Sequence, residues 1–523
     1  MKAYPSIFND CLSPVSPGPS SSNTAGPYRL GAMASDMLSG APAHLNVEMC
    51  TRGGYSATFY GMHSDKGFLV GVMKKNIRTY PFDQTYEGAK AVNLTYSFEF
   101  TENVPVKPSE TAWLTLTSDT GDKVFIKTAS LGGGEIIIDE VDGLKTYIDG
   151  KYYYMLIRTA TADVEKFTAK LSGYYTVESC AQCGQSLITV RQRTPYCPDF
   201  VAELRAMAEA IYVRCVEPVY DIIPIDDPQM PFVTATEMFA YAKEKNIPLW
   251  QAAIDYEKAL SGLSDQQIMG LAERIWDVSV YSAEQGYNAL THDEGLTKSH
   301  AIQLRELMQT GTVIPLGIAN RAASDALSIG QHALTHGVIA CTPTGGASGV
   351  PVPSIRYSAE ALGLSKEDCL KALLVAGIIG IIYYPTHYHG AWGCQAEIGV
   401  AISMTAGALA SFISDDLDVI ERAAVLGAQS ILGQICDPIA GAGHVPCMIR
   451  NITAIPTAAI CANAAKGGVE TLTSLDEMAE TLLRVGLKLK EYGLNDLGVC
   501  YAAEQRKAAA AAACCNCTGC GAC

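Results

Sequence analysis

Three cysteines in the last third of the chain lie in short turns from which a thiolate can leave the backbone. Cys394 follows Trp-Gly, Cys436 precedes Asp-Pro and Cys447 follows Val-Pro, at separations of 42 and 11 positions. Three thiolates can hold three corners of a [4Fe-4S] cluster and leave one iron open for a substrate, whereas four ligands favour electron transfer. Because free cysteine is also among the commonest buried residues, a packing role is equally consistent with each one alone.

Two loops rich in hydroxyl groups and glycine are candidate anion sites, since backbone N–H groups at helix starts and glycine-rich turns bind anions. They are predicted to bind a substrate carboxylate. Each loop alone is a weak signal, because most such loops only connect elements. The candidates in the first loop are Ser20, Ser21, Ser22, Asn23 and Thr24, and those in the second are Thr344, Gly346, Ala347, Ser348 and Gly349.

Several of the nine histidines stand close to these segments. His387 and His389 precede Cys394, His444 precedes Cys447 by three positions, and His63 lies in Gly-Met-His-Ser-Asp. Imidazole titrates near neutral pH and is the usual general base, although a lone histidine is more often a surface or core residue. We predict a catalytic role for His63, His389 or His444.

The segments around these residues resemble, in order and spacing, the iron-sulfur-dependent L-serine dehydratases. The resemblance covers about residues 10 to 500, with the beta and alpha parts of that family fused in one chain, and rests on residues 18–27, 342–351, 393–400, 436–441 and 445–447. It implies that Cys394, Cys436 and Cys447 hold a [4Fe-4S] cluster. The open iron would act as a Lewis acid on the β-hydroxyl of L-serine, giving pyruvate and ammonia without pyridoxal phosphate.

His63 matches a histidine of the family, but the sequence departs from the family at three other histidine positions. Asn23 stands where the family has histidine in Ser-Ser-Ser-His-Thr, the family's His-Pro-Asn aligns near Ala91-Val92-Asn93, and Ser430 replaces a third histidine. An amide does not accept a proton at useful pH. The alternatives are therefore the same machinery acting on another small hydroxy acid, amino acid or cysteine, or a non-catalytic iron-sulfur protein.

The last seventeen residues change in composition. Six alanines, 508 to 513, precede five cysteines within the final ten positions. This composition predicts a low-complexity tail. The resemblance gives the C-terminal Cys523 a further role as a provisional ligand to the open iron, and a separate metal or redox role for the tail is the remaining alternative.

The overall composition and charge of the chain argue against some classes of function. The chain has 523 residues, 48% hydrophobic and 18% charged, with a net charge of −16, which argues against nucleic acid and anionic membranes. The most apolar stretch, 370–382, is too short to span a bilayer and is predicted to be a buried core helix. Eighteen cysteines without an export signal predict a reducing, cytoplasmic location. The expected partners are a small amino acid or hydroxy acid and, in a homodimer, a second copy of the chain.

The elements that must position these residues divide the chain. Residues 1–190 mix helical segments, such as the one predicted after Gly26-Pro27, with β-rich ones such as 67–73 and 123–127 and predict an α+β domain. Residues 191–230, with prolines and aspartates, are expected to be a linker. From 231 to 506 the apolar pattern is helical, with a helix cap predicted at Thr234, and predicts an all-α, cluster-binding domain, with the tail at 507–523. The predicted fold class is an α+β N-terminal domain followed by a mostly α-helical domain.

Overall fold

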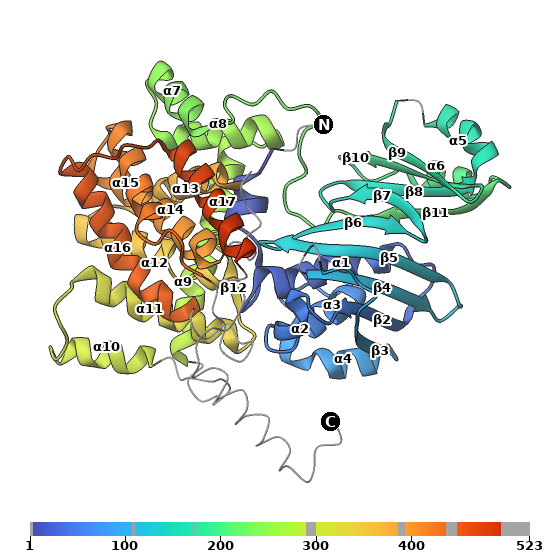
Figure 1. The fold of residues 1–523 in the computed structure, drawn as a ribbon, viewed down its shortest axis with the longest axis horizontal. Helices are drawn as coiled ribbons and strands as arrows, with labels where there is room; N and C mark the ends of the chain where they lie inside the picture. Colours follow the sequence, from blue (N-terminus) through green and yellow to red (C-terminus); the bar gives the residue numbers. More distant parts are fainter. Residues whose placement is uncertain are drawn as a thin grey trace, which may run out of the picture. The chain divides into compact units, whose positions relative to one another are not determined.

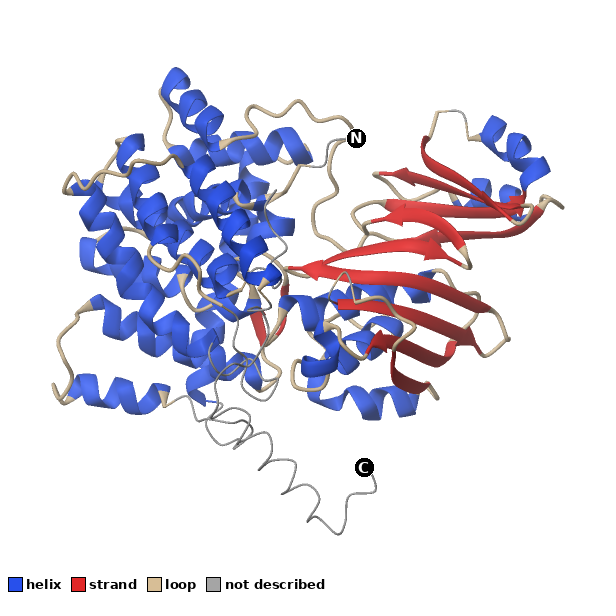
Figure 2. Cartoon of the chain, viewed as in Figure 1, coloured by secondary structure: helices blue, strands red, loops and turns tan. Residues whose placement is uncertain are grey.

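The computed structural model of the chain describes residues 4–106, 108, 110–171, 173–288, 300–384, 393–435 and 447–492 (Figure 1). Two compact units emerge. The sheet unit comprises Met1–Pro17, Ser21–Pro231 and Ile254–Leu271, and the helical unit comprises Gly18–Ser20, Phe232–Ala253 and Ala272–Cys523. Strands dominate the first and helices the second (Figure 2), which confirms the predicted fold class.

The first sheet of the sheet unit has six strands, in the order β3-β2-β4-β5-β6-β7. β2 pairs with β3 in parallel, and the other neighbours pair antiparallel. Side chains of β4 and β5 alternate between buried and partly exposed, as a strand with one covered face requires. The strands are β2 (Pro42–Cys50), β3 (Thr95–Thr101), β4 (Glu110–Ser118), β5 (Lys123–Gly132), β6 (Glu135–Val141) and β7 (Leu144–Ile148).

Short helices cover the apolar face of this sheet: α1 (Gly26–Asp36), α2 (Gly54–Thr58), α3 (Ser64–Val72) and α4 (Thr85–Ala91). The stretch 67–73, expected to be a strand, is helical in α3, so that prediction is wrong. Glycine explains the difference. A Cβ on Gly71 would lie 2.1 Å from the carbonyl oxygen of Tyr28 in α1, so only glycine allows the two helices to pack this closely. The helix expected after Gly26-Pro27 is confirmed as α1.

The second sheet follows the element order β-α-β-β-α-β of a ferredoxin-like unit, with strand order β11-β8-β10-β9. Its core joins strand residues such as Met155, Ile188 and Val213 to Phe167 of α5 and Leu204 of α6. Residues 191–230, expected to be a linker, contain α6 and β11. The elements are β8 (Tyr153–Ala160), α5 (Val164–Lys170), β9 (Tyr175–Gln182), β10 (Gln185–Gln192), α6 (Pro198–Arg205) and β11 (Ala210–Val216).

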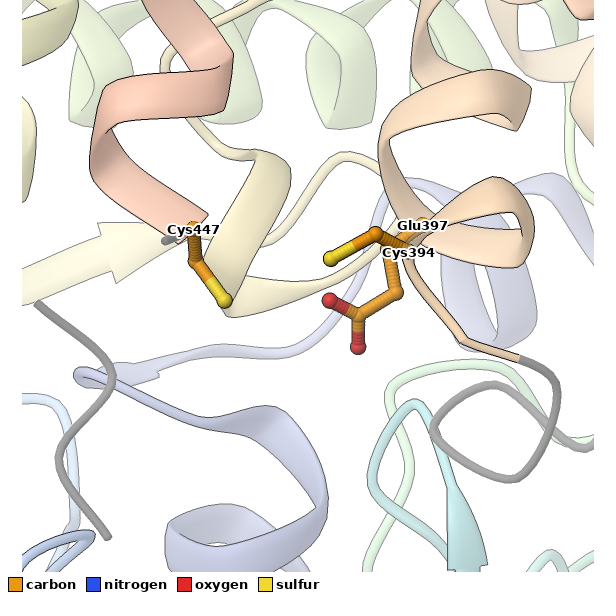
Figure 3. A group of neighbouring side chains, drawn as sticks. All are labelled: Cys394, Glu397 and Cys447. Carbon is orange, nitrogen blue, oxygen red and sulfur yellow. The ribbon is translucent and has the colours of Figure 1, made fainter. Parts of the chain in front are cut away.

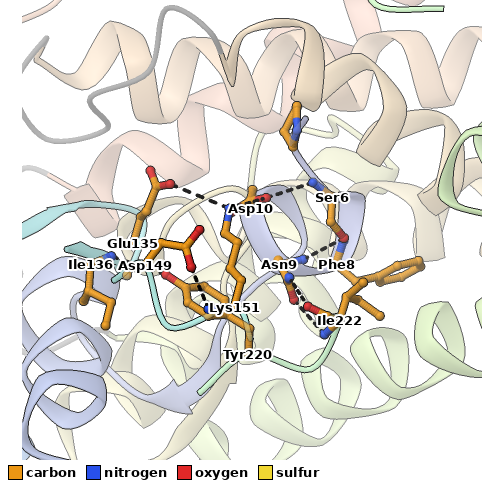
Figure 4. Close-up of polar contacts among 12 residues, drawn as sticks. Ser6, Phe8, Asn9, Asp10, Glu135, Ile136, Asp149, Lys151, Tyr220 and Ile222 are labelled. Carbon is orange, nitrogen blue, oxygen red and sulfur yellow. Dashed lines mark hydrogen bonds and ion pairs between the residues drawn. The ribbon is translucent and has the colours of Figure 1, made fainter. Parts of the chain in front are cut away.

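A buried polar network fixes the N-terminal turn Ile7–Cys11 within the sheet unit (Figure 4). Glu257 is fully buried and accepts hydrogen bonds from the Ser6 hydroxyl at 2.7 Å and the Ile7 N–H at 2.9 Å. Asp10 accepts from the Ser6 N–H and pairs with Lys151 at 3.2 Å. Burial raises the pKa of Glu257 to about 7, against the effect of its hydrogen bonds, because a charge is poorly solvated there.

Helices build the helical unit. Capping boxes at Thr234, Ser365 and Ser474 start α7, α13 and α17, and the first confirms the helix start expected at Thr234. α8 and α9 each run across the boundary between the units. The helices are α7 (Ala235–Lys245), α8 (Leu249–Ser261), α9 (Asp265–Asn288), α10 (Ala301–Gln309), α11 (Ile318–Leu334), α12 (Pro351–Leu362), α13 (Lys366–Ile382), α14 (Val400–Ile413), α15 (Leu417–Gln429), α16 (Ile449–Lys466) and α17 (Leu475–Glu491).

The centre of the helical unit is formed by helices that are apolar on all sides. α13 and α14 are almost wholly buried, as expected for a core helix over 370–382. In the described residues, one helical stretch, Gln395–Ile413, has the length and composition to cross a membrane. Because 78% of it is buried inside the unit, its apolar surface is accounted for by packing.

Candidate functional site

Cys394 and Cys447 each lie at the start of a core helix of the helical unit. Gly393 adopts a φ of +75°, which glycine tolerates, and Cys394 then begins the π-turn Gln395–Gly399 that continues into α14. Cys447 stands two residues before α16. The Cys394 side chain is 1% exposed, and neither cysteine forms a disulfide. Two separate turns thus place two reduced thiols close together.

A carboxylate joins the two thiols. The Sγ atoms of Cys394 and Cys447 and one carboxylate oxygen of Glu397 all lie within 4.8 Å of one another (Figure 3). The adjacent Cys394 thiol, burial and the charge of Glu397 raise the pKa of Cys447 well above its usual value, and the Arg450 cation acts in the opposite direction. Three groups that can each become anionic therefore share a small, partly buried space, and a bound cation would offset their repulsion.

The second glycine-rich loop closes over this group. A Cβ on Gly346 would lie 3.1 Å from Oε2 of Glu397 and 3.5 Å from Sγ of Cys447, so a side chain there would crowd both. Thr342 and Thr344 are 0% and 2% exposed, and in the described part of the chain their hydroxyl groups have no hydrogen-bond partner. A buried hydroxyl without a partner is costly unless a ligand supplies one.

Asn451 ties this loop to the Cys447 turn. Its Nδ2 donates to the carbonyl oxygens of Gly346 at 2.6 Å and Cys447 at 2.7 Å, and its Oδ1 accepts from the Gly349 N–H at 3.1 Å. The side chain is 3% exposed. Asn451 lies four positions after Cys447, one turn further along α16, and therefore faces the same loop.

A third set of hydrogen bonds fixes the turn that leads into Cys436. Gln395 accepts from the Gly433 N–H at 2.8 Å and donates through its backbone N–H to Gln434 at 3.1 Å. Arg450 donates to the carbonyl oxygen of Ile435 at 2.7 Å. The residue before Cys436 is thereby anchored to the helix that follows Cys447.

Other predicted residues of the second loop have mainly backbone roles. Ala347 is buried, and the Ser348 hydroxyl donates to the Gly345 carbonyl oxygen at 2.9 Å. A Cβ on Gly349 would lie 2.9 Å from Ala326 of α11, so the loop packs tightly on that helix. Cys436, His387, His389, His444 and Cys523 lie outside the described residues, and their roles stay predictions.

The first loop is arranged differently. Ser20 belongs to the helical unit, and Ser21 to Thr24 lie in a π-turn of the sheet unit. Asn23 accepts hydrogen bonds from the hydroxyls of Thr58 at 2.9 Å and Ser64 at 3.5 Å, and Thr24 donates to the Met62 carbonyl oxygen at 2.9 Å.

These contacts bring His63 beside the first loop, because its neighbours Met62 and Ser64 are the residues that the loop contacts. His63 takes a left-handed φ of +61° ahead of α3, and its ring lies 6.5 Å from that of Phe82. The other two positions that lack a family histidine lie at helix ends: Ser430 caps α15, and Ala91 is the last residue of α4.

The donor chemistry fits an iron-binding site. Thiolate and carboxylate groups are iron ligands, and two of the three predicted cluster cysteines lie together in a buried, cross-linked setting. Sequence reasoning missed Glu397, Asn451, Gln395 and Arg450. Their spacing in the sequence could have identified them, because each lies within four positions of Cys394 or Cys447, and a helical turn brings nearby side chains together.

Residues 244–499 match the family model described as serine dehydratase alpha chain. The helical part of the chain therefore resembles the L-serine dehydratase family. It is 26% identical over 257 residues to the probable L-serine dehydratase alpha chain of Bacillus subtilis, covering 49% of this chain and 86% of that protein. It is 28% identical to the L-serine dehydratase alpha chain of Peptoniphilus asaccharolyticus, covering 50% and 93%.

A third relative has a longer chain. L-serine dehydratase 1 of Escherichia coli is 30% identical over 272 residues, which cover 49% of this chain but 58% of that protein. These three matches therefore take in about half of this chain. The described site residues Cys394, Glu397 and Cys447 all fall inside the family segment.

Proposed function

We propose that this protein is an iron-sulfur-dependent L-serine dehydratase that releases pyruvate and ammonia. The observation that carries the proposal is the meeting of Cys394 and Cys447 beside a glycine-rich loop in which two buried hydroxyl groups have no partner among the described residues. The names of the relatives, all L-serine dehydratases, support the substrate and make the protein a lyase.

Different residues would serve different parts of the elimination reaction. Cys394, Cys436 and Cys447 would hold a [4Fe-4S] cluster, which supplies Lewis acidity toward the β-hydroxyl leaving group. The hydroxyls of Thr342 and Thr344 would bind the substrate carboxylate, and Gly346 leaves room beside the thiols. Asn451 and Gln395 would hold the loop and the Cys436 turn in register.

The protein must also move the α-proton and exclude water. His63 is the predicted base for which the structure describes a position, and its imidazole can accept a proton near neutral pH. Cys394 and the adjacent Gln395 are each 1% exposed, so bulk water has little access to that thiol. A cytoplasmic location and a homodimer belong to the same proposal.

The second candidate is the same chemistry on another small β-substituted acid. Asn23 favours it, because the family histidine is absent there and the amide instead accepts hydrogen bonds from Thr58 and Ser64. A substrate contact made by that histidine would have to come from elsewhere.

The test is an anaerobic assay of ammonia and keto acid release. L-serine, L-threonine, L-cysteine and the corresponding hydroxy acids are compared at equal concentrations. We expect L-serine to have the highest kcat/KM. A higher kcat/KM for another acid would move the assignment to the second candidate, and no turnover of any of them would contradict both.

A further inference from the structure

The spacing of Cys394, Glu397 and Cys447 suits a single metal ion. A tetrahedral ion about 2.3 Å from each sulfur and about 2.1 Å from an oxygen places its ligand atoms roughly 3.5 to 3.8 Å apart. The three side chains already hold one ligand atom each within 4.8 Å of one another. Thiolates on two different irons of a cluster lie outside a four-iron core and must be further apart. Small side-chain rotations thus suffice for one ion, whereas a cluster requires the two sulfur atoms to move further apart.

The donor set selects the kind of ion. Two thiolates favour Zn²⁺, Fe²⁺ and Co²⁺ over Mg²⁺ and Ca²⁺, which prefer oxygen ligands. Three protein ligands leave the fourth tetrahedral position open, as in catalytic zinc sites. Binding would release one proton from each thiol, because a cysteine binds such metals as a thiolate.

Glu397 is held in position for this role. It lies three residues after Cys394 on the same π-turn, and Figure 3 shows both side chains turned toward Cys447. A Cβ on Gly346 would lie 3.1 Å from Oε2 of Glu397, so the loop passes close to this carboxylate.

We propose that Cys394, Glu397 and Cys447 form a mononuclear site for a divalent, thiol-seeking metal ion, and that this ion and a [4Fe-4S] cluster compete for the same cysteines. The site itself stands apart from the proposed function, and only the competition depends on it. Glu397 belongs to the mononuclear site and is not a ligand of the cluster.

Co²⁺ is the probe, because tetrahedral thiolate coordination gives it visible bands that most other sites lack. The full-length chain is used with its five tail cysteines, 514, 515, 517, 520 and 523, changed to serine, and with metals removed anaerobically by a chelator. We expect one Co²⁺ per chain with tetrahedral bands and loss of these bands in Cys394→Ser and Cys447→Ser. Cys461→Ser, a change of a buried cysteine within α16, should bind Co²⁺ like the parent.

Glu397→Gln gives the sharper result, because the amide has the same shape and a glutamine is a poor metal ligand. We expect the Co²⁺ affinity to fall by at least about 10-fold, the low end of what loss of even an outer-shell partner costs. Glu480→Gln, on the exposed face of α17, is the control. Equal affinity in Glu397→Gln and the parent, or bands that persist in Cys394→Ser, would overturn the proposal. Circular dichroism of each variant confirms that it is folded.

A second experiment separates this inference from the proposed function. Iron and sulfide are added to the parent and to Glu397→Gln, with and without one equivalent of Zn²⁺. We expect both proteins to become brown without Zn²⁺, and Zn²⁺ to suppress the colour more strongly in the parent. Co²⁺ binding without any cluster formation would contradict the function but keep the metal site. Cluster formation in a parent that binds no Co²⁺ would contradict the metal site but keep the proposed function.

Discussion

The two loops that the sequence predicts for carboxylate binding differ in how their polar groups are used. In the loop at 21–24, Asn23 and Thr24 make hydrogen bonds to Thr58, Ser64 and Met62 within the sheet unit. In the loop at 342–349, the buried hydroxyls of Thr342 and Thr344 have no partner among the described residues. The polar groups of the first loop thus form hydrogen bonds within the sheet unit. Two hydroxyl groups of the second loop have no partner among the described residues and are available to a ligand.

Loop composition therefore does not by itself identify a binding site. Both loops contain hydroxyl residues and precede or contain a helical turn, so sequence reasoning ranks them alike. Burial together with hydrogen-bond satisfaction separates them, because an unpaired buried hydroxyl carries a free-energy cost that a native protein rarely retains without a use. The following predictions test that difference.

The largest effect is expected from the cysteines beside the second loop. Cys394→Ser and Cys447→Ser should each lose the visible absorbance of the cluster and reduce dehydratase activity below detection, because serine binds iron poorly. Absorbance spectra and the anaerobic pyruvate assay measure both. Cys341→Ser, a buried cysteine of the same unit, should keep both properties. A full cluster in either variant would remove that cysteine from the ligand set.

His63 tests whether the first loop also serves catalysis through its neighbour. His63→Asn should lower kcat by about 10²- to 10⁴-fold, the usual contribution of a general base, with a smaller change in KM. His44→Asn, an exposed histidine of β2, is the matched control. Steady-state kinetics under anaerobic conditions give the answer. A kcat within about threefold of the parent would exclude His63 as the base.

Glu257 gives the sheet unit a predicted pH dependence. Its pKa is about 7 in the folded state and 4.5 unperturbed, so between these values the folded state binds more protons than the unfolded state. The free energy of unfolding therefore falls as pH rises from 4.5 to about 7, by about 3 kcal/mol from this group. Urea unfolding across this range should show a shallower fall in Glu257→Gln. Identical slopes in variant and parent would show that Glu257 is ionised in the fold.

The smallest effect is a matched pair of threonine substitutions. Thr24→Val removes a hydroxyl that donates to Met62, and should lower the free energy of unfolding by about 1 kcal/mol. Thr344→Val removes an unpaired buried hydroxyl, and should leave stability equal or higher while raising KM for L-serine. Denaturant titrations and kinetics on both variants show whether each hydroxyl stabilises the fold or binds the substrate. Equal losses of stability in Thr24→Val and Thr344→Val would show that the hydroxyl groups of both loops stabilise the fold alike.

Much of the fold could be predicted from the sequence. The helix after Gly26-Pro27, the helix start at Thr234 and the buried helix over 370–382 follow from caps and apolar runs, which are local signals. The segment 67–73 could not be assigned this way. Its composition predicts a strand, and only the close contact of Gly71 with α1 shows why the segment suits a helix. The pairing of β11 with β8 is likewise a long-range contact.

For the site, the family resemblance singled out Cys394, Cys447 and the 342–349 loop, and the structure brings them together. The contributions of Glu397 and Asn451 depend on which way each side chain faces at the helix starts. Asn451 in particular is an ordinary glycosylation-like sequon by sequence, and its three hydrogen bonds to loop and turn emerge only from the packed structure.

The most direct test of the account follows cluster content and L-serine turnover in the same sample. Anaerobically purified protein is assayed for visible absorbance, iron and sulfide per chain, and pyruvate release, first as prepared, then after air exposure, and then after treatment with iron, sulfide and reductant. The account predicts that turnover rises and falls in proportion to the cluster absorbance and returns with it. Steady pyruvate formation by aerated protein that contains no iron would contradict it.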